Sequence, residues 1–61
     1  MKTYFWQDLP YEIQNDLFVT LSEKTGSNEV ADDYINRNNT LKTLGEWEET
    51  IENYWRFTLD K

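Results

Sequence analysis

Apolar residues recur at helical spacing along most of the chain, and the first such segment spans residues 9–24. One face of this segment carries an apolar residue every four positions, the period of an amphipathic helix. These residues are Leu9, Ile13, Leu17 and Leu21, with Tyr11 and Phe18 widening the same face. Asp8 is the expected N-cap, and Pro10 lies in the first turn, where its missing N–H costs nothing. Gly26 is positioned to end the helix in a left-handed conformation.

Residues 28–38 form the second predicted helix, with Ser27 or Asn28 as its N-cap. Its two faces differ in polarity. The inward face is predicted to hold Val30, Ala31, Tyr34 and Ile35, and the outward face Glu29, Asp32, Asp33 and Asn36. The segment is short and ends in an Asn-rich run that predicts a loop.

Residues 44–58 form the third predicted helix. Thr43 and Glu46 have the spacing of a capping box, in which each side chain bonds the other residue's backbone N–H. The apolar stripe repeats at helical spacing. Its members are Leu44, Trp47, Ile51, Tyr54 and Trp55. Residues 55–59 are also prone to form a strand, so a strand at the end of the chain is the alternative for this part.

Residues 3–6 precede the first helix and predict a short extended aromatic arm that packs over the helices. A strand pairing between this arm and residues 55–59 is the alternative arrangement. With 61 residues, the chain has room for one domain. The predicted fold class is therefore all-α, a small three-helix single domain with a short N-terminal aromatic arm.

The composition excludes several kinds of chemistry. The chain has no Cys and no His, so thiol or imidazole catalysis, disulfides and zinc sites are excluded. The adjacent pairs Asp32-Asp33 and Glu48-Glu49 cannot form a catalytic dyad, because neighbouring helix residues point about 100° apart. Glu49 and Glu52 lie one turn apart, but a solvated helix face is the favoured interpretation. We expect no enzyme, no catalytic residue, no cofactor and no metal.

No run of apolar residues reaches the length that spans a bilayer, and the first residues lack the apolar core of a signal peptide. We therefore expect no membrane partner and a cytoplasmic location.

The segment from Leu21 to Gly26, followed by a short helix, resembles the turn of a helix-turn-helix module. The second helix would then be the reading helix. Its outward residues are acidic or neutral, whereas contact with phosphates needs Lys or Arg, and Arg37 is its single basic residue. The charges oppose direct nucleic-acid binding, so a small transcription-regulator module is kept as the alternative.

The stretch from Leu9 to Ile13, with Leu17, Phe18 and Leu21, is similar to the opening of an F-box, the adaptor helix of ubiquitin ligases. The similarity covers about a fifth of the chain and consists of helix-start and stripe residues. The later Leu-rich stretch of that family is replaced here by Asp32-Asp33 and an Asn-rich loop. The resemblance therefore assigns no function.

The net charge is −6, and each third of the chain contributes −2. Solubility alone explains a charge of this size. The functional interpretation is mimicry, in which helical carboxylates imitate phosphates and bind a basic surface of another protein. The leading hypothesis is a small acidic non-enzymatic binding protein, an inhibitor or modulator of the kind that phages and mobile elements carry. A structural or assembly subunit is a further alternative.

Two sets of residues are the candidates for binding a partner protein, one acidic and one aromatic. They are Glu46, Glu49, Asp32 and Asp33, and the aromatic residues outside the stripes, Tyr4, Trp6 and Phe57. Bulky apolar residues number twenty-two, counting Leu, Ile, Val, Met and the aromatics, which is more than three short helices can cover. This excess predicts a homodimer.

Overall fold

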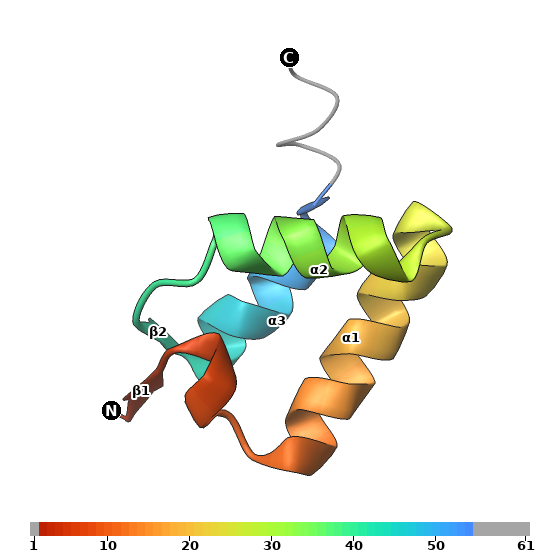
Figure 1. The fold of residues 1–61 in the computed structure, drawn as a ribbon. Helices are drawn as coiled ribbons and strands as arrows, with labels where there is room; N and C mark the ends of the chain where they lie inside the picture. Colours follow the sequence, from red (N-terminus) through yellow and green to blue (C-terminus); the bar gives the residue numbers. More distant parts are fainter. Residues whose placement is uncertain (1, 55–61) are drawn as a thin grey trace.

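The computed structural model describes residues 2–54 and contains three α-helices, one 3₁₀ turn and two very short strands (Figure 1). In chain order these are β1 (Thr3–Tyr4), η1 (Trp6–Asp8), α1 (Tyr11–Thr25), α2 (Asn28–Arg37), β2 (Lys42–Thr43) and α3 (Leu44–Glu52). The all-α, three-helix prediction with an N-terminal arm is confirmed.

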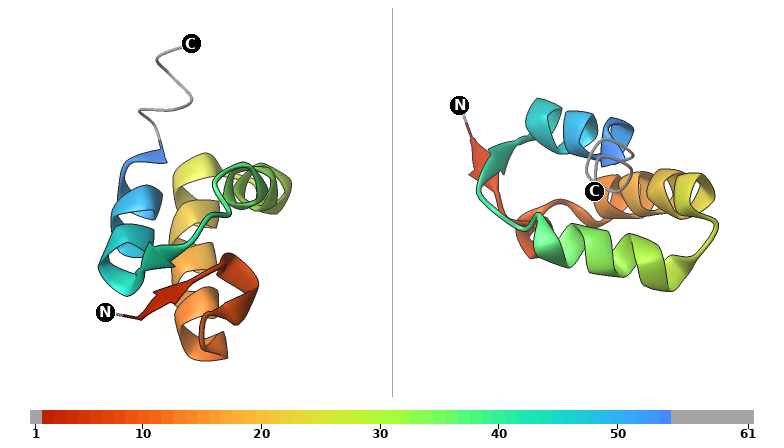
Figure 2. Two further views of the ribbon diagram at one scale, coloured as in Figure 1. Left: turned by 90° about the vertical axis from the view of Figure 1, so that its left-hand side faces the viewer. Right: turned by 90° about the horizontal axis from the view of Figure 1, so that it is seen from above.

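The chain turns a sharp corner between α1 and α2, and α3 packs behind them (Figure 1). Seen from above, the β1–β2 ladder closes the end where the arm begins (Figure 2), and α2 is joined to α3 by the Tyr34 hydroxyl, which donates to the Thr50 carbonyl at 2.8 Å. The corner is made at Gly26, which has a φ of 75° and donates its N–H to the carbonyl of Ser22 at 2.8 Å. A left-handed residue of this kind ends the helix as the sequence predicts.

The first helix begins two residues later than predicted. Asp8 is not its N-cap, because residues 6–8 form η1 and Pro10 occupies the N-cap position. The reason lies in Leu9, whose ψ is 146°: the proline ring clashes with the preceding backbone and drives that residue out of the helical region. A helix that includes Leu9 is therefore sterically opposed.

The inward face of α2 is narrower than predicted. Ala31, Tyr34 and Ile35 are buried, whereas Val30 is 45% exposed. Val30 lies in the first turn, roughly 100° around the helix from Ala31, which places it at the edge of the buried face. The Ser27 hydroxyl accepts a hydrogen bond from the Val30 N–H at 3.4 Å, so the predicted cap is confirmed.

The capping box of α3 is also confirmed. The Glu46 N–H donates to the Thr43 hydroxyl at 3.2 Å, and the Thr43 N–H donates to the Glu46 carboxylate at 2.8 Å. The helix ends at Glu52 with Asn53 as its C-cap, earlier than the predicted end at residue 58. Residues 55–58 of that prediction, and the alternative strand at 55–59, lie outside the described residues.

The N-terminal arm pairs with the segment that leads into α3. β1 and β2 are antiparallel, with Thr3 opposite Thr43 and Tyr4 opposite Lys42. The indole N–H of the buried Trp47 donates to the Tyr4 carbonyl at 2.9 Å. The arm is thus held by β2, through the strand pairing, and by α3, through Trp47.

The core lies where the three helices meet. Its buried residues are Leu9, Leu21, Ala31, Tyr34, Ile35, Trp47 and Ile51. Trp6 meets Trp47 edge-on at a centroid distance of 5.5 Å. Tyr11, predicted to widen the inward face of α1, is instead 79% exposed. It is the first residue of α1 and lies off the buried face that Leu21 defines.

Candidate interaction surface

Every carboxylate of the described residues is exposed to solvent. The eleven side chains are Asp8, Glu12, Asp16, Glu23, Glu29, Asp32, Asp33, Glu46, Glu48, Glu49 and Glu52. Within residues 2–54, two of the eleven take part in ion pairs: Asp33 bonds Arg37 at 2.9 Å, and Glu52 lies 3.8 Å from Lys24. Nine carboxylates therefore face water without a cation at ion-pair distance in this part of the chain.

The cations of the described residues are engaged within the molecule. Besides the two ion pairs, the Lys42 ammonium lies 4.6 Å from the centroid of the Trp47 ring and donates to the Thr40 hydroxyl at 2.6 Å. The Lys2 ammonium lies 5.5 Å from the Tyr4 ring centroid. Burial lowers the pKa of Lys42, and the nearby Glu46 carboxylate opposes that change. The surface open to a partner is consequently negative.

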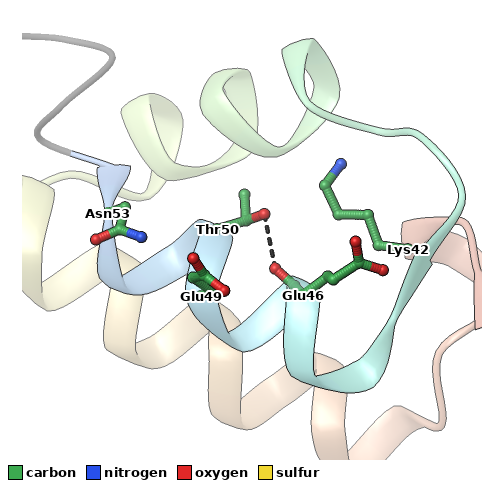
Figure 3. Close-up of a pocket in the computed structure, with 5 residues that line it drawn as sticks. All are labelled: Lys42, Glu46, Glu49, Thr50 and Asn53. Atoms are coloured by element: carbon green, nitrogen blue, oxygen red, sulfur yellow. Dashed lines mark hydrogen bonds between the residues drawn. The ribbon is translucent and has the colours of Figure 1, made fainter.

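The predicted residues Glu46 and Glu49 line a hollow of about 250 Å³ on α3, together with Lys42, Thr50 and Asn53 (Figure 3). Glu46 is already engaged there. Its hydrogen bonds from the backbone and side chain of Thr43 lower its pKa, and Lys42 adds to that effect. A proton or a partner that competes for Glu46 would therefore act against the capping box.

The predicted residues Asp32 and Asp33 lie on α2, away from that hollow. Asp33 pairs with Arg37, and Asp32 accepts a hydrogen bond from the Asn36 amide at 3.3 Å. Asp32 lines a second hollow, between α1 and α2. The structure thus divides the four predicted carboxylates between two surfaces.

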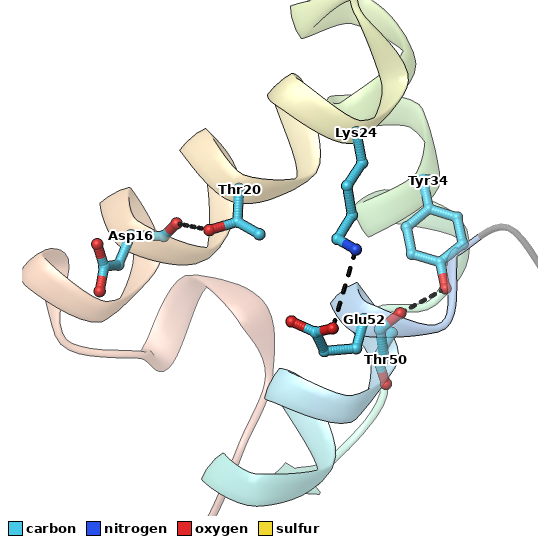
Figure 4. Close-up of polar contacts among 6 residues, drawn as sticks. All are labelled: Asp16, Thr20, Lys24, Tyr34, Thr50 and Glu52. Carbon is cyan, nitrogen blue, oxygen red and sulfur yellow. Dashed lines mark hydrogen bonds and ion pairs between the residues drawn. The ribbon is translucent and has the colours of Figure 1, made fainter.

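A row of carboxylates on α1 escaped the sequence reasoning. Glu12, Asp16 and Glu23 are all exposed, and helical geometry places them within about 40° of one another around the axis. We call these three residues the α1 acidic row. The backbone carbonyl of Asp16 accepts from Thr20 at 3.0 Å, while its carboxylate points away from the Lys24–Glu52 pair (Figure 4). The spacing of i, i+4 and i+11 was the available signal.

The predicted aromatic residues Tyr4 and Trp6 are half-buried and belong to the packed arm. The backbone N–H of Trp6 donates to the Asn39 side-chain oxygen at 2.8 Å, and the backbone carbonyl of Trp6 accepts from the Gln14 side-chain amide at 2.7 Å. Trp6 also lines the second hollow. Phe57, the third predicted aromatic, lies outside the described residues.

The second hollow has a volume of about 240 Å³ and is bordered by three aromatic rings. We call it the aromatic groove, and its lining residues are Trp6, Tyr11, Gln14, Asn15, Phe18 and Asp32. The sequence pattern placed Tyr11 and Phe18 on the inward face of α1; Phe18 is half-buried and packs against the core, whereas Tyr11 is 79% exposed. Their separation of seven residues, two helical turns, was the signal that they share one face.

Comparison with protein-family models, curated proteins and solved structures finds no match. Residues 2–54 hold no group of three acidic side chains arranged to bind a metal ion. In the same part of the chain, no helix has both the length and the apolar character needed to cross a bilayer.

Proposed function

We propose that this chain is a cytoplasmic, non-enzymatic protein that binds a positively charged surface of another protein and thereby inhibits or modulates it. The observation that carries the proposal is the charge imbalance of the described surface. Nine exposed carboxylates have no ion-pair partner there, whereas the cations contact carboxylates, aromatic rings or backbone. Such a surface attracts basic partners and repels nucleic acid.

Phosphate mimicry is the mechanism that this arrangement supports. In the α1 acidic row, Glu12 and Asp16 are about 6 Å apart along the helix axis, and Asp16 and Glu23 about 10 Å. A rigid helix holds these charges in a line, as a nucleic-acid backbone does. A protein that binds phosphates through Lys and Arg would meet a comparable row of anions here. By analogy of size and charge, we place the chain with the small acidic inhibitors or modulators that phages and mobile elements carry.

The test compares two charge-reversal variants of equal net charge. One carries Asp16→Lys and Glu23→Lys on α1, and the other carries Glu48→Lys and Glu49→Lys on α3. Each protein is immobilised, exposed to cell lysate at low salt and eluted by a salt gradient, and the retained proteins are identified. We expect retained basic proteins to elute from the α1 variant at clearly lower salt than from the α3 variant.

Glu46 is left intact in both variants, because its reversal would also destroy the capping box of α3. Circular dichroism checks that each variant keeps its helical content. The proposal would be refuted if the retained proteins stayed bound at high salt and bound both charge-reversal variants as tightly as the parent protein. If the salt concentration needed for elution fell equally in both variants, binding would depend on the net charge and not on the α1 acidic row.

The sharp corner between α1 and α2 is the observation that favours the helix-turn-helix alternative. The charges oppose it, since α2 exposes Glu29, Asp32 and Asp33 and its Arg37 is paired with Asp33. At physiological salt we expect affinity for duplex DNA weaker than ~10⁻⁴ M, below that of typical non-specific binders. Tight, strongly salt-dependent binding would establish the alternative.

We also propose that the chain forms a homodimer. Such self-association is equally compatible with the alternative that the protein is a structural or assembly subunit. Phe5 and Leu41 are 37% and 59% exposed. The β1–β2 register, continued by one residue past Tyr4 and Lys42, places them opposite one another. This apolar pair, one residue on the arm and one just before β2, is the part of the described surface that best supports a two-fold contact.

A further inference from the structure

The aromatic groove combines ring faces with a carboxylate, the two features that favour an organic cation. Building on the proposed function, we infer that the groove receives an arginine side chain from a basic segment of the partner protein. The guanidinium group would stack on Tyr11 and donate hydrogen bonds to Asp32. The groove thus supplies a specific contact where the acidic surface supplies general attraction.

One residue of the groove, Trp6, is held in place before any partner binds. Tyr11 is 79% exposed, so its ring is open to a ligand. Trp6 is fixed by its backbone bonds to Asn39 and Gln14, at 2.8 and 2.7 Å, and by its edge-on contact with Trp47. A ligand therefore meets a groove in which Trp6 is already ordered, which limits the conformational entropy lost on binding.

Hydrogen-bond acceptors border the same groove. Asn36 donates to the Oδ2 atom of Asp32, and within the described residues Oδ1 is left to accept from a ligand. The Nε2 atom of Gln14 is engaged with the Trp6 carbonyl, so its Oε1 atom is the group left to meet a donor. The lining contains one carboxylate and no cation. This arrangement suits the five N–H donors of a planar guanidinium better than a compact ammonium.

The volume and the net charge identify the source of the cation. About 240 Å³ lies below the range of roughly 300–1,000 Å³ typical of sites for whole small molecules, but it suits one side chain. A second copy of the chain is a poor occupant, because it carries a charge of −6 and, within residues 2–54, its one arginine, Arg37, is already bonded to Asp33. A basic partner segment complements both the groove and the surrounding acidic surface.

The experiment titrates isotope-labelled protein with a short peptide that holds one arginine between glycines, observed by NMR. The matched ligand replaces arginine with citrulline, which keeps the shape and removes the charge. We expect shifts centred on the amides of Tyr11, Asn15 and Asp32 with the arginine peptide, and affinity lower by about two- to fivefold or more with citrulline.

Three variants locate the binding determinants. Asp32→Asn and Tyr11→Leu should each weaken the arginine peptide by about two- to fivefold. Glu48→Gln is the control, because it removes an exposed carboxylate that lines neither hollow, and it should change nothing at the groove. Both groove residues are exposed at the surface, so circular dichroism should show an unchanged fold.

Equal shifts with both peptides, or no shift at the groove, would overturn the inference. Shifts over the α1 acidic row or α3 would do the same while leaving the proposed function intact. Groove shifts that appear on raising the protein concentration alone would show that a second copy occupies the groove, again overturning the inference. The proposed function fails on a different result: basic proteins that stay bound at high salt and bind both charge-reversal variants as tightly as the parent protein.

Discussion

Replacing Trp47 with Phe removes the N–H group that joins the N-terminal arm to α3. Trp47 is fully buried, and its indole N–H donates to the Tyr4 carbonyl at 2.9 Å. Loss of this hydrogen bond costs about 0.5–1.5 kcal/mol, and the smaller ring leaves a void that adds about 1 kcal/mol. We expect a total loss of about 1.5–2.5 kcal/mol. A chain of 61 residues has about 3–9 kcal/mol of stability in all, so the loss is a large share of it.

Trp6→Phe is the matched control, since Trp6 is the other ring of the same edge-on pair and its indole N–H makes no hydrogen bond within residues 2–54. Urea denaturation followed by circular dichroism measures both variants, and amide hydrogen exchange reports on β1. We expect the larger loss, together with faster exchange in β1, for Trp47→Phe. Equal losses, or protection of β1 unchanged by Trp47→Phe, would refute the role given to this hydrogen bond.

Three further predictions concern the core, the cap and the assembly. Leu21→Ala should lower the free energy of unfolding by about 2–5 kcal/mol, and Leu17→Ala by less, because Leu21 is fully buried whereas Leu17 is half-buried. Thermal denaturation of the two variants measures the difference. Glu46 has a pKa below its ordinary 4.5, so its contribution to stability is present above that pH and is lost as the pH falls through the lowered pKa. Glu46→Gln keeps the acceptor without titrating, and urea denaturation at several pH values should show a weaker acid dependence. Sedimentation should give a dimer that Leu41→Glu converts to the 7.4 kDa monomer, and a parent protein that is already monomeric at tens of micromolar would exclude the dimer.

Local sequence signals predicted those parts of the fold that depend on neighbouring residues. The Thr43–Glu46 capping box, the stop at Gly26 and the cap at Ser27 each involve groups within four residues of one another. The apolar stripes placed Leu21, Ile35 and Trp47 in the core for the same reason. The start of α1 was open to prediction as well, because the restriction that Pro10 imposes on Leu9 is local.

The remaining features depend on contacts between segments far apart in the chain. The arm could have paired with several extended stretches, and the hydrogen bond from Trp47 to Tyr4, across 43 positions, favours the partner before α3. Tyr11 was assigned to the core from its place in an apolar pattern, but burial there depends on where η1 and α2 lie. The acidic residues were visible in the sequence, whereas their division between two surfaces required the helix packing.

Trp6 shows why the fold and the candidate binding surface are difficult to separate in so small a chain. Its ring packs edge-on against Trp47, and the same residue lines the aromatic groove. The backbone N–H of Trp6 joins this residue to Asn39 in the loop after α2, while its carbonyl joins it to Gln14 of α1. The groove is therefore shaped by the same contacts that hold the arm, so any partner that requires the groove also requires the arm in its packed position.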